Sequence, residues 1–131
     1  MTKLNPVVHF EMPYENQKRV SEFYSKVFSW EMKYLPKMGS YVLATTTPID
    51  KKTQRPKDPG AINGGFYPKG DYGKTPHVVI SVDNLEKHME IVKMNGGKIL
   101  GEVMDISGIG KFVMFLDTEG NRVGMLQPTS M

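Results

Sequence analysis

Two stretches of the chain alternate apolar and polar residues, and each is followed by a helical pattern. The apolar residues at every second position are Val8, Phe10 and Met12 in the first stretch, and Val78, Ile80 and Val82 in the second. Alternation with a period of two is typical of a strand with one buried face. The pattern therefore predicts strands over residues 7–12 and 76–82.

Apolar residues then recur at the spacing of one helix face. They are Val20, Phe23, Tyr24, Val27 and Phe28 after the first strand, and Leu85, Met89 and Val92 after the second. An acidic residue opens each helix, Glu15 or Asp83, and Asp83 with Glu86 fits a capping box. Glycines after residue 95 end the second helix, since glycine accepts the left-handed conformation of a helix end. We expect helices over residues 15–28 and 84–95.

The two stretches belong to an internal repeat. His77 lies 68 residues after His9, and the strand-helix pattern around the two histidines aligns without gaps. Both copies end on a glycine-containing segment, GAINGGFYP at residues 60–68 and GNRVGMLQP at residues 120–128. Further strands are predicted over residues 30–36, 40–47, 60–67, 98–105, 111–117 and 121–127. The fold class is therefore α+β, with two tandem β-α-β-β-β modules.

We expect one domain over residues 1–131, with module one at 5–70 and module two at 74–128. If each helix covers the apolar face of its strands, alternation leaves the other face to His9 and Glu11 in one copy and to His77 in the other. Pairing of the modules would then give a curved, partly closed mixed sheet around a central cavity that these residues line.

Composition narrows the function classes. The 131 residues are 39% hydrophobic, carry a net charge of +3 and include no cysteine. Without cysteine, disulfides and thiolate chemistry are excluded. The sequence also has no basic stripe interleaved with aromatic residues, so we do not expect it to bind nucleic acid. No apolar run approaches the length of a membrane span. The segment MTKLNPVVHF lacks the apolar core of a secretory signal, so we expect a cytoplasmic protein.

Three segments in order resemble the glyoxalase / bleomycin-resistance / extradiol-dioxygenase group, the vicinal oxygen chelate superfamily. They are FYSKVFSWEM, HVVISVDNLEKHMEIVKMNGGKIL and FLDTEGNRVGMLQ. The chain looks most similar to the small proteins related to lactoylglutathione lyase, in which a segment like GGFYP closes the first module. The resemblance covers residues 7–127.

The resemblance implies metal ligands on the first and last strands of each module in the metal-dependent members. His9 and His77 match the first-strand positions, whereas the last-strand positions fall on Gly64 and Gly124. Neither last-strand position supplies the carboxylate that such a site needs, although Glu11 lies on the same strand face as His9. We therefore expect no metal and no cofactor.

Two main readings of the function remain open. In the first, the chain binds a small organic molecule through the cavity residues His9, Ile62, Gly64, Phe66, His77, Arg122, Gly124 and Leu126. In the second, it is a metal-dependent or divergent lyase, isomerase or dioxygenase. Glu11 would then be the catalytic base, because burial makes a carboxylate a better proton acceptor. A purely structural or partner-binding domain is a third reading. We expect a homodimer, and the sequence leaves open whether two chains exchange modules.

Overall fold

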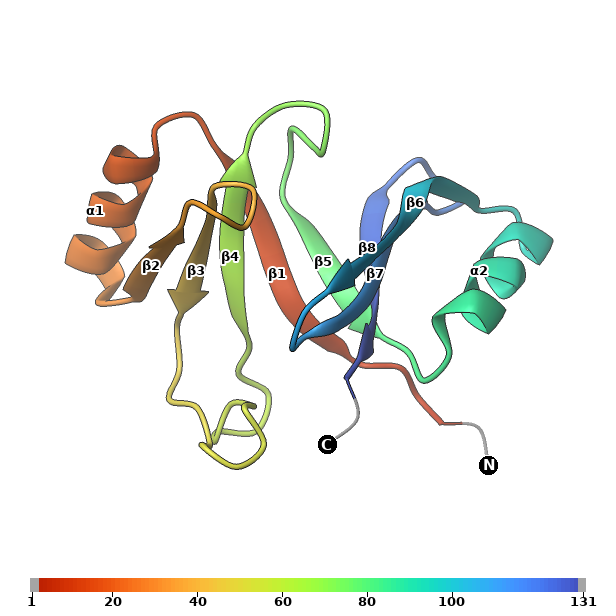
Figure 1. Ribbon diagram of the computed structural model, residues 1–131, viewed down its shortest axis with the longest axis horizontal. Helices are drawn as coiled ribbons and strands as arrows, with labels where there is room; N and C mark the ends of the chain where they lie inside the picture. The colour runs from red at the N-terminus through yellow and green to blue at the C-terminus, as the bar shows by residue number, and fades with distance from the viewer. Residues whose placement is uncertain (1–2, 130–131) are drawn as a thin grey trace. The chain divides into compact units, whose positions relative to one another are not determined.

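The computed structural model describes residues 3–129 and contains the predicted element order twice (Figure 1). The first set is β1 (Val7–Tyr14), α1 (Gln17–Phe28), β2 (Glu31–Leu35), β3 (Tyr41–Thr45) and β4 (Asn63–Pro68). The second set is β5 (His77–Ser81), α2 (Leu85–Met94), β6 (Lys98–Ile106), β7 (Gly110–Leu116) and β8 (Arg122–Pro128). The α+β class and the tandem β-α-β-β-β modules are confirmed. The central cavity and the single-domain assignment stay predictions.

The described residues form two compact units. Residues 9–76 make up one unit, called module one below, and residues 77–129 with the segment before His9 make up the other, called module two. The start of β1 therefore belongs with module two, where the Ser81 amide donates to the Pro6 carbonyl at 2.9 Å. Neither helix is long and apolar enough to cross a membrane within the part of the chain that the structure describes.

Module one is a four-stranded sheet in the order β2-β3-β4-β1, with α1 against one face. β1 and β4 run parallel, while the other neighbouring pairs run antiparallel. The buried core residues are Val42, Ala44 and Phe66, and against them pack Phe10, Met12, Tyr14, Val20, Tyr24, Trp30 and Met32. The alternating residues Phe10 and Met12 thus face the helix, as the sequence pattern predicts.

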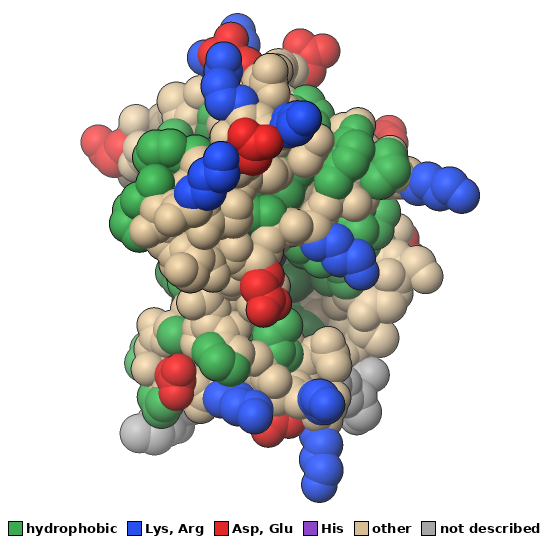
Figure 2. Space-filling model, turned by 90° about the vertical axis from the view of Figure 1, so that its left-hand side faces the viewer, with side chains coloured by type: hydrophobic (Ala, Val, Ile, Leu, Met, Phe, Trp, Pro, Cys, Tyr) green, Lys and Arg blue, Asp and Glu red, His purple; other side chains and the backbone are tan. Residues whose placement is uncertain are grey.

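The apolar stripe of α1 is wider than the core that it covers. Val20 and Tyr24 pack against the core, but Phe23, Val27 and Phe28 are 53%, 54% and 57% exposed. Figure 2 faces this side of the molecule and shows hydrophobic side chains at the surface between charged ones. The helical period was therefore predicted correctly, and only Val20 and Tyr24 of the stripe pack against the core.

Module two repeats the arrangement with its own core. Its strand order is β5-β8-β7-β6, with β5 and β8 parallel and the other pairs antiparallel. The core residues are Val82, Leu85, Val113 and Met125, packed by Ile80, Met89, Val92, Ile99 and Phe115. The predicted helix face of α2 supplies three of these side chains, so the repeat extends from element order to packing.

The helix starts differ from the predicted acidic caps. The N-cap residues are Asn16 and Asn84, whose side chains accept from the amides of Arg19 at 2.9 Å and Lys87 at 3.0 Å. Asparagine is among the strongest N-cap residues because its side-chain oxygen reaches the free amides of the first turn. Asp83 instead forms an exposed ion pair with Lys3 at 2.9 Å.

Candidate functional site

The face of module one opposite α1 carries a set of polar side chains. In the parallel pair of β1 and β4, His9 lies opposite Asn63 and Glu11 lies opposite Gly65. Directly opposed residues share a face of the sheet, and the next residue along lies on the other face. His9, Glu11 and Gly65 therefore lie on one face, away from the core residues Phe10 and Met12.

Two tyrosines from other segments join His9 and Glu11. The Tyr72 hydroxyl donates to Oε1 of Glu11 at 2.7 Å, and the Tyr41 hydroxyl lies 2.8 Å from Nε2 of His9. The Tyr41 hydroxyl also hydrogen-bonds to Glu11. Glu11 is only 7% exposed, so these hydroxyl groups replace water around its carboxyl. We call His9, Glu11, Tyr41 and Tyr72 the polar cluster.

Tyr41 is a neutral hydrogen-bonding group within this cluster. Burial raises the pKa of the Tyr41 hydroxyl far above its ordinary value of 10.0, and the charge and hydrogen bond of Glu11 raise it further. The phenol therefore keeps its proton at any ordinary pH. When it donates that proton to Glu11, its oxygen accepts from His9, which places a hydrogen on Nε2 of the imidazole.

A glycine makes room for the Tyr41 ring. A Cβ atom added to Gly65 would fall onto the Tyr41 side chain at its ring and hydroxyl. Tyr41 belongs to β3, and its side chain extends across β4 at Gly65. Its hydroxyl thereby reaches β1, where His9 and Glu11 lie. The glycine is thus required by the side chain that lies over it, which is the close approach expected of a glycine in a strand.

The segment after β4 brings Tyr72 to the cluster. Gly70 and Gly73 exchange backbone hydrogen bonds of 3.0 and 3.1 Å and close a tight turn around Asp71 and Tyr72. The Tyr67 hydroxyl donates to the Thr75 carbonyl at 2.6 Å and holds the end of the segment. The Tyr67 and Tyr72 rings meet edge to face, with centroids 4.8 Å apart.

Two predicted site residues lie on the other face of module one. Gly64 pairs with Phe10, and its added Cβ would lie 2.5 Å from the Phe10 ring, while Phe66 belongs to the buried core. The structure therefore does not bring Gly64 and Phe66 together with Glu11 on one face, and their role in ligand binding stays a prediction. The repeat alignment matched the wrong glycine of a Gly64-Gly65 pair, and a shift of one residue moves a side chain to the opposite face of a sheet.

The remaining predicted residues are placed as follows. Ile62 precedes β4, and its carbonyl accepts from the Thr46 hydroxyl at 2.7 Å. His77 opens β5 and is 7% exposed. In module two, Arg122, Gly124 and Leu126 alternate along β8, and Gly124 lies opposite Val79, two residues after His77. These four module-two residues therefore share a face, and their role in ligand binding stays a prediction.

Sequence reasoning missed Tyr41, Gly65 and Tyr72. Tyr41 was counted as an ordinary strand residue, and Tyr72 lies in the segment of module one that follows β4. The sequence holds two indications of them. The double glycine at 64–65 offers a second register, and the segment GDYG at 70–73 is a turn pattern that carries one large aromatic residue.

The residues present do not fit the metal site that the resemblance implies. The last-strand positions opposite Glu11 and Val79 are Gly65 and Gly124, and neither supplies a donor atom. Within residues 3–129, no group of three or more His, Asp or Glu side chains is placed to hold a metal ion. In module one, hydroxyl groups stand against the His9 and Glu11 atoms that would coordinate one.

Comparisons with known proteins agree with this fold. The chain is 33% identical over 119 residues to a glyoxylase-like domain-containing protein from Didymella fabae, covering 85% of this chain and 84% of the relative. A hypothetical protein from Bacillus halodurans C-125 has a similar structure, with a TM-score of 0.67, 16% identity and 98% of both chains covered.

A second similar structure contains a ligand. It is a variant of the methylmalonyl-CoA epimerase of Streptomyces coelicolor in complex with 2-nitronate-propionyl-CoA, with a TM-score of 0.66, 12% identity and 98% of both chains covered. At this identity the likeness shows the fold alone. The family model of the Glyoxalase/Bleomycin resistance protein/Dioxygenase superfamily matches residues 7–125, and the chain therefore belongs to that superfamily.

Proposed function

We propose that this chain binds a small organic molecule at the polar cluster of module one, without a divalent metal. The observation that carries the proposal is the burial of Glu11 among hydroxyl groups. Burying a carboxylate costs free energy even when it is hydrogen-bonded, and an apolar side chain at this position would avoid that cost. A binding site with a few placed polar groups gives the carboxylate a use.

The hydrogen bonds define what the cluster offers to a ligand. Glu11 accepts hydrogen bonds, and the neutral Tyr41 hydroxyl connects it to His9. A molecule with hydroxyl or amine donors would bind to such an acceptor, because hydrogen bonds to a charged group are stronger than those between neutral groups. The cytoplasmic location, the homodimer and the relation to lactoylglutathione lyase that the sequence suggests belong to this proposal.

The test is a ligand screen on the purified protein with EDTA present. Thermal-shift measurements with small organic molecules, CoA esters included, should yield compounds that stabilise the native protein. Replacement of Glu11 by Gln should weaken their binding by roughly 10-fold or more, as expected for loss of a charged acceptor. The matched control is Glu22→Gln on the exposed side of α1, which should leave binding unchanged. Binding that needs added metal, or that survives Glu11→Gln in full, contradicts the proposal.

One observation favours an enzyme as the second candidate. His9, Tyr41 and Glu11 form a continuous hydrogen-bonded path along which a proton could pass. A lyase or isomerase of this kind would take a proton from its substrate with Glu11. NMR in D₂O distinguishes the candidates, since a ligand that is only bound keeps its C–H signals, whereas a substrate exchanges the reacting hydrogen for deuterium.

A further inference from the structure

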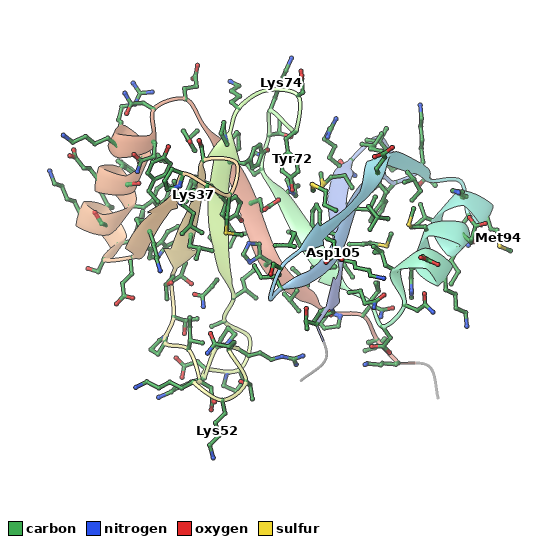
Figure 3. All side chains as sticks on the ribbon, in the orientation of Figure 1. Lys37, Lys52, Tyr72, Lys74, Met94 and Asp105 are labelled. Carbon is green, nitrogen blue, oxygen red and sulfur yellow. The ribbon has the colours of Figure 1, made fainter. Side chains whose placement is uncertain are left out.

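Tyr72 belongs to a segment that lies outside the sheet, yet its side chain reaches into the polar cluster. Its neighbours Asp71, Lys74 and Thr75 are exposed, whereas Tyr72 is half-buried. In Figure 3, Lys74 lies at the outer end of this segment and Tyr72 lies nearer to the strands. The turn from Gly70 to Gly73 orients Tyr72 toward β1, where its hydroxyl meets Glu11.

The contacts of Tyr72 resemble those of a bound aromatic molecule. The hydroxyl donates to the Glu11 carboxylate at 2.7 Å. The ring packs against the Tyr67 ring at 4.8 Å with an interplanar angle of 72°, the edge-to-face geometry that aromatic pairs prefer. A free phenol could make both contacts without being attached to the chain.

Resting on the function proposed above, we propose that Tyr72 occupies the ligand position of the polar cluster, and that the ligand is a hydroxyaryl compound that displaces it. The incoming ring packs against Tyr67, and its hydroxyl donates to Glu11. The Tyr72 side chain swings out with the turn from Gly70 to Gly73, while the hydrogen bond from Tyr67 to Thr75 stays in place. Tyr72 thus acts as an internal competitor, and its removal strengthens binding.

The two tyrosines on Glu11 differ in how readily they can move. Tyr41 lies on β3, which pairs with β2 on one side and with β4 on the other. Moving it would break into the sheet. Tyr72 lies in a turn outside the paired strands, between the exposed Asp71 and the buried Gly73, and such segments open at a much lower free-energy cost than paired strands. The displaced group is therefore Tyr72, while Tyr41 keeps Glu11 and His9 in place.

The experiment replaces Tyr72 by Ala and titrates the folded variant with phenol and with anisole, using calorimetry. Anisole has nearly the same shape but no hydroxyl donor. Phenol should bind Tyr72→Ala at least about 10-fold more tightly than anisole does, the factor expected for one hydrogen bond to a charged acceptor. It should bind the native protein more weakly than the variant. Tyr72→Phe keeps a ring at this position but removes its hydrogen bond to Glu11, so its affinity for phenol should lie between those of the native protein and Tyr72→Ala.

Tyr34→Ala is the matched control for unspecific binding of phenol. Tyr34 lies on β2, is 43% exposed and is not part of the polar cluster. This variant should bind phenol no better than the native protein. Equal binding of phenol and anisole by Tyr72→Ala, or equal gains in Tyr72→Ala and Tyr34→Ala, overturns the proposal.

A second measurement uses the native protein, in case Tyr72→Ala does not fold. With ring-labelled tyrosine and the Tyr72 signal assigned from Tyr72→Phe, phenol should shift the Tyr72 ring signal toward that of an exposed tyrosine. An unchanged Tyr72 signal at saturating phenol overturns the proposal. The displacement of Tyr72 and the proposed function can be tested separately. If phenol does not displace Tyr72 but the ligand screen finds compounds whose binding depends on Glu11, the proposed function still holds. An empty screen removes the proposed function itself.

Discussion

The ring of Tyr41 lies directly over Gly65, so that the first atom of any side chain at position 65 would collide with it. This contact ties β3 to β4 on the face that carries Glu11, which lies opposite Gly65 on β1. The two positions are therefore coupled, because the phenol can reach His9 and Glu11 only while residue 65 has no side chain.

Gly65→Ala should therefore destabilise the protein. Overpacking of this kind costs about 1–3 kcal/mol of unfolding free energy, since the ring must move or the strand must shift. Urea unfolding measures the change. Gly70→Ala is the matched control, because an added Cβ at Gly70 meets nothing within 4 Å. When Tyr41 is already replaced by Ala, Gly65→Ala should cost little unfolding free energy. An equal cost with and without Tyr41 would contradict the contact between Tyr41 and position 65.

The raised pKa of Tyr41 predicts a loss of stability in alkali. The unfolded chain releases the phenol proton near the ordinary pKa of 10.0, while burial and Glu11 keep it bound in the folded protein. The contribution of the protonated Tyr41 hydroxyl to the unfolding free energy is therefore complete below pH 10 and is lost as the pH rises above 10. The unfolding free energy should fall by up to about 1.4 kcal/mol per pH unit there for this one group.

Replacement of Tyr41 by Phe isolates that contribution. The variant has a lower stability at neutral pH because the hydrogen bond to His9 is lost, but its slope above pH 10 should be smaller by one proton. Chemical unfolding at several pH values between 8 and 11 gives both slopes. Identical slopes would show that Tyr41 titrates in the folded protein like an exposed tyrosine.

The helix caps predict a contrast between neighbouring residues. Asn16→Ala and Asn84→Ala should each cost about 1 kcal/mol of unfolding free energy, because each removes the side-chain acceptor for an amide of the first turn. Glu15→Ala, one residue before the first cap, should change stability far less. A larger loss of unfolding free energy in Glu15→Ala than in Asn16→Ala would mean that Glu15, and not Asn16, caps α1.

The element order could be predicted from the sequence because it depends on local patterns. Alternation at Phe10 and Met12 identified β1 and its buried face, and the glycines after residue 95 marked the end of α2, where Gly96 has a φ of 93°. Each of these features is set by residues a few positions apart. The repeat of 68 residues then transferred the interpretation from one module to the other, and even the caps Asn16 and Asn84 obey it.

The polar cluster could be predicted only in part. His9 and Glu11 followed from alternation along a single strand, since both lie on the face opposite Phe10. Tyr41 and Tyr72 could not be found in the same way, because their positions depend on the register of β3 against β4 and on the path of the turn after β4. In a sheet, an error of one residue exchanges the two faces, which is why Gly64 was chosen in place of Gly65.

The corrected register predicts where a metal site could be built in module one. A side chain at position 65 would point to the place of the Tyr41 hydroxyl, which hydrogen-bonds to both His9 and Glu11. In the double variant Tyr41→Ala/Gly65→Glu, the new carboxylate replaces the phenol and joins His9 and Glu11. One imidazole and two carboxylates are ligands that divalent transition metals accept. Calorimetry with Ni²⁺ should show binding at least about 10-fold tighter than in Tyr41→Ala alone, because even an outer-shell partner of a metal ligand changes metal affinity by about 10–100-fold. The two carboxylates repel each other without an ion, so folding is checked by circular dichroism with Ni²⁺ present.

Adding His9→Ala to the double variant should abolish the gain in Ni²⁺ affinity. If the triple variant binds Ni²⁺ as tightly as the double variant, residue 65 does not point toward His9, and the geometry assigned to the polar cluster is wrong.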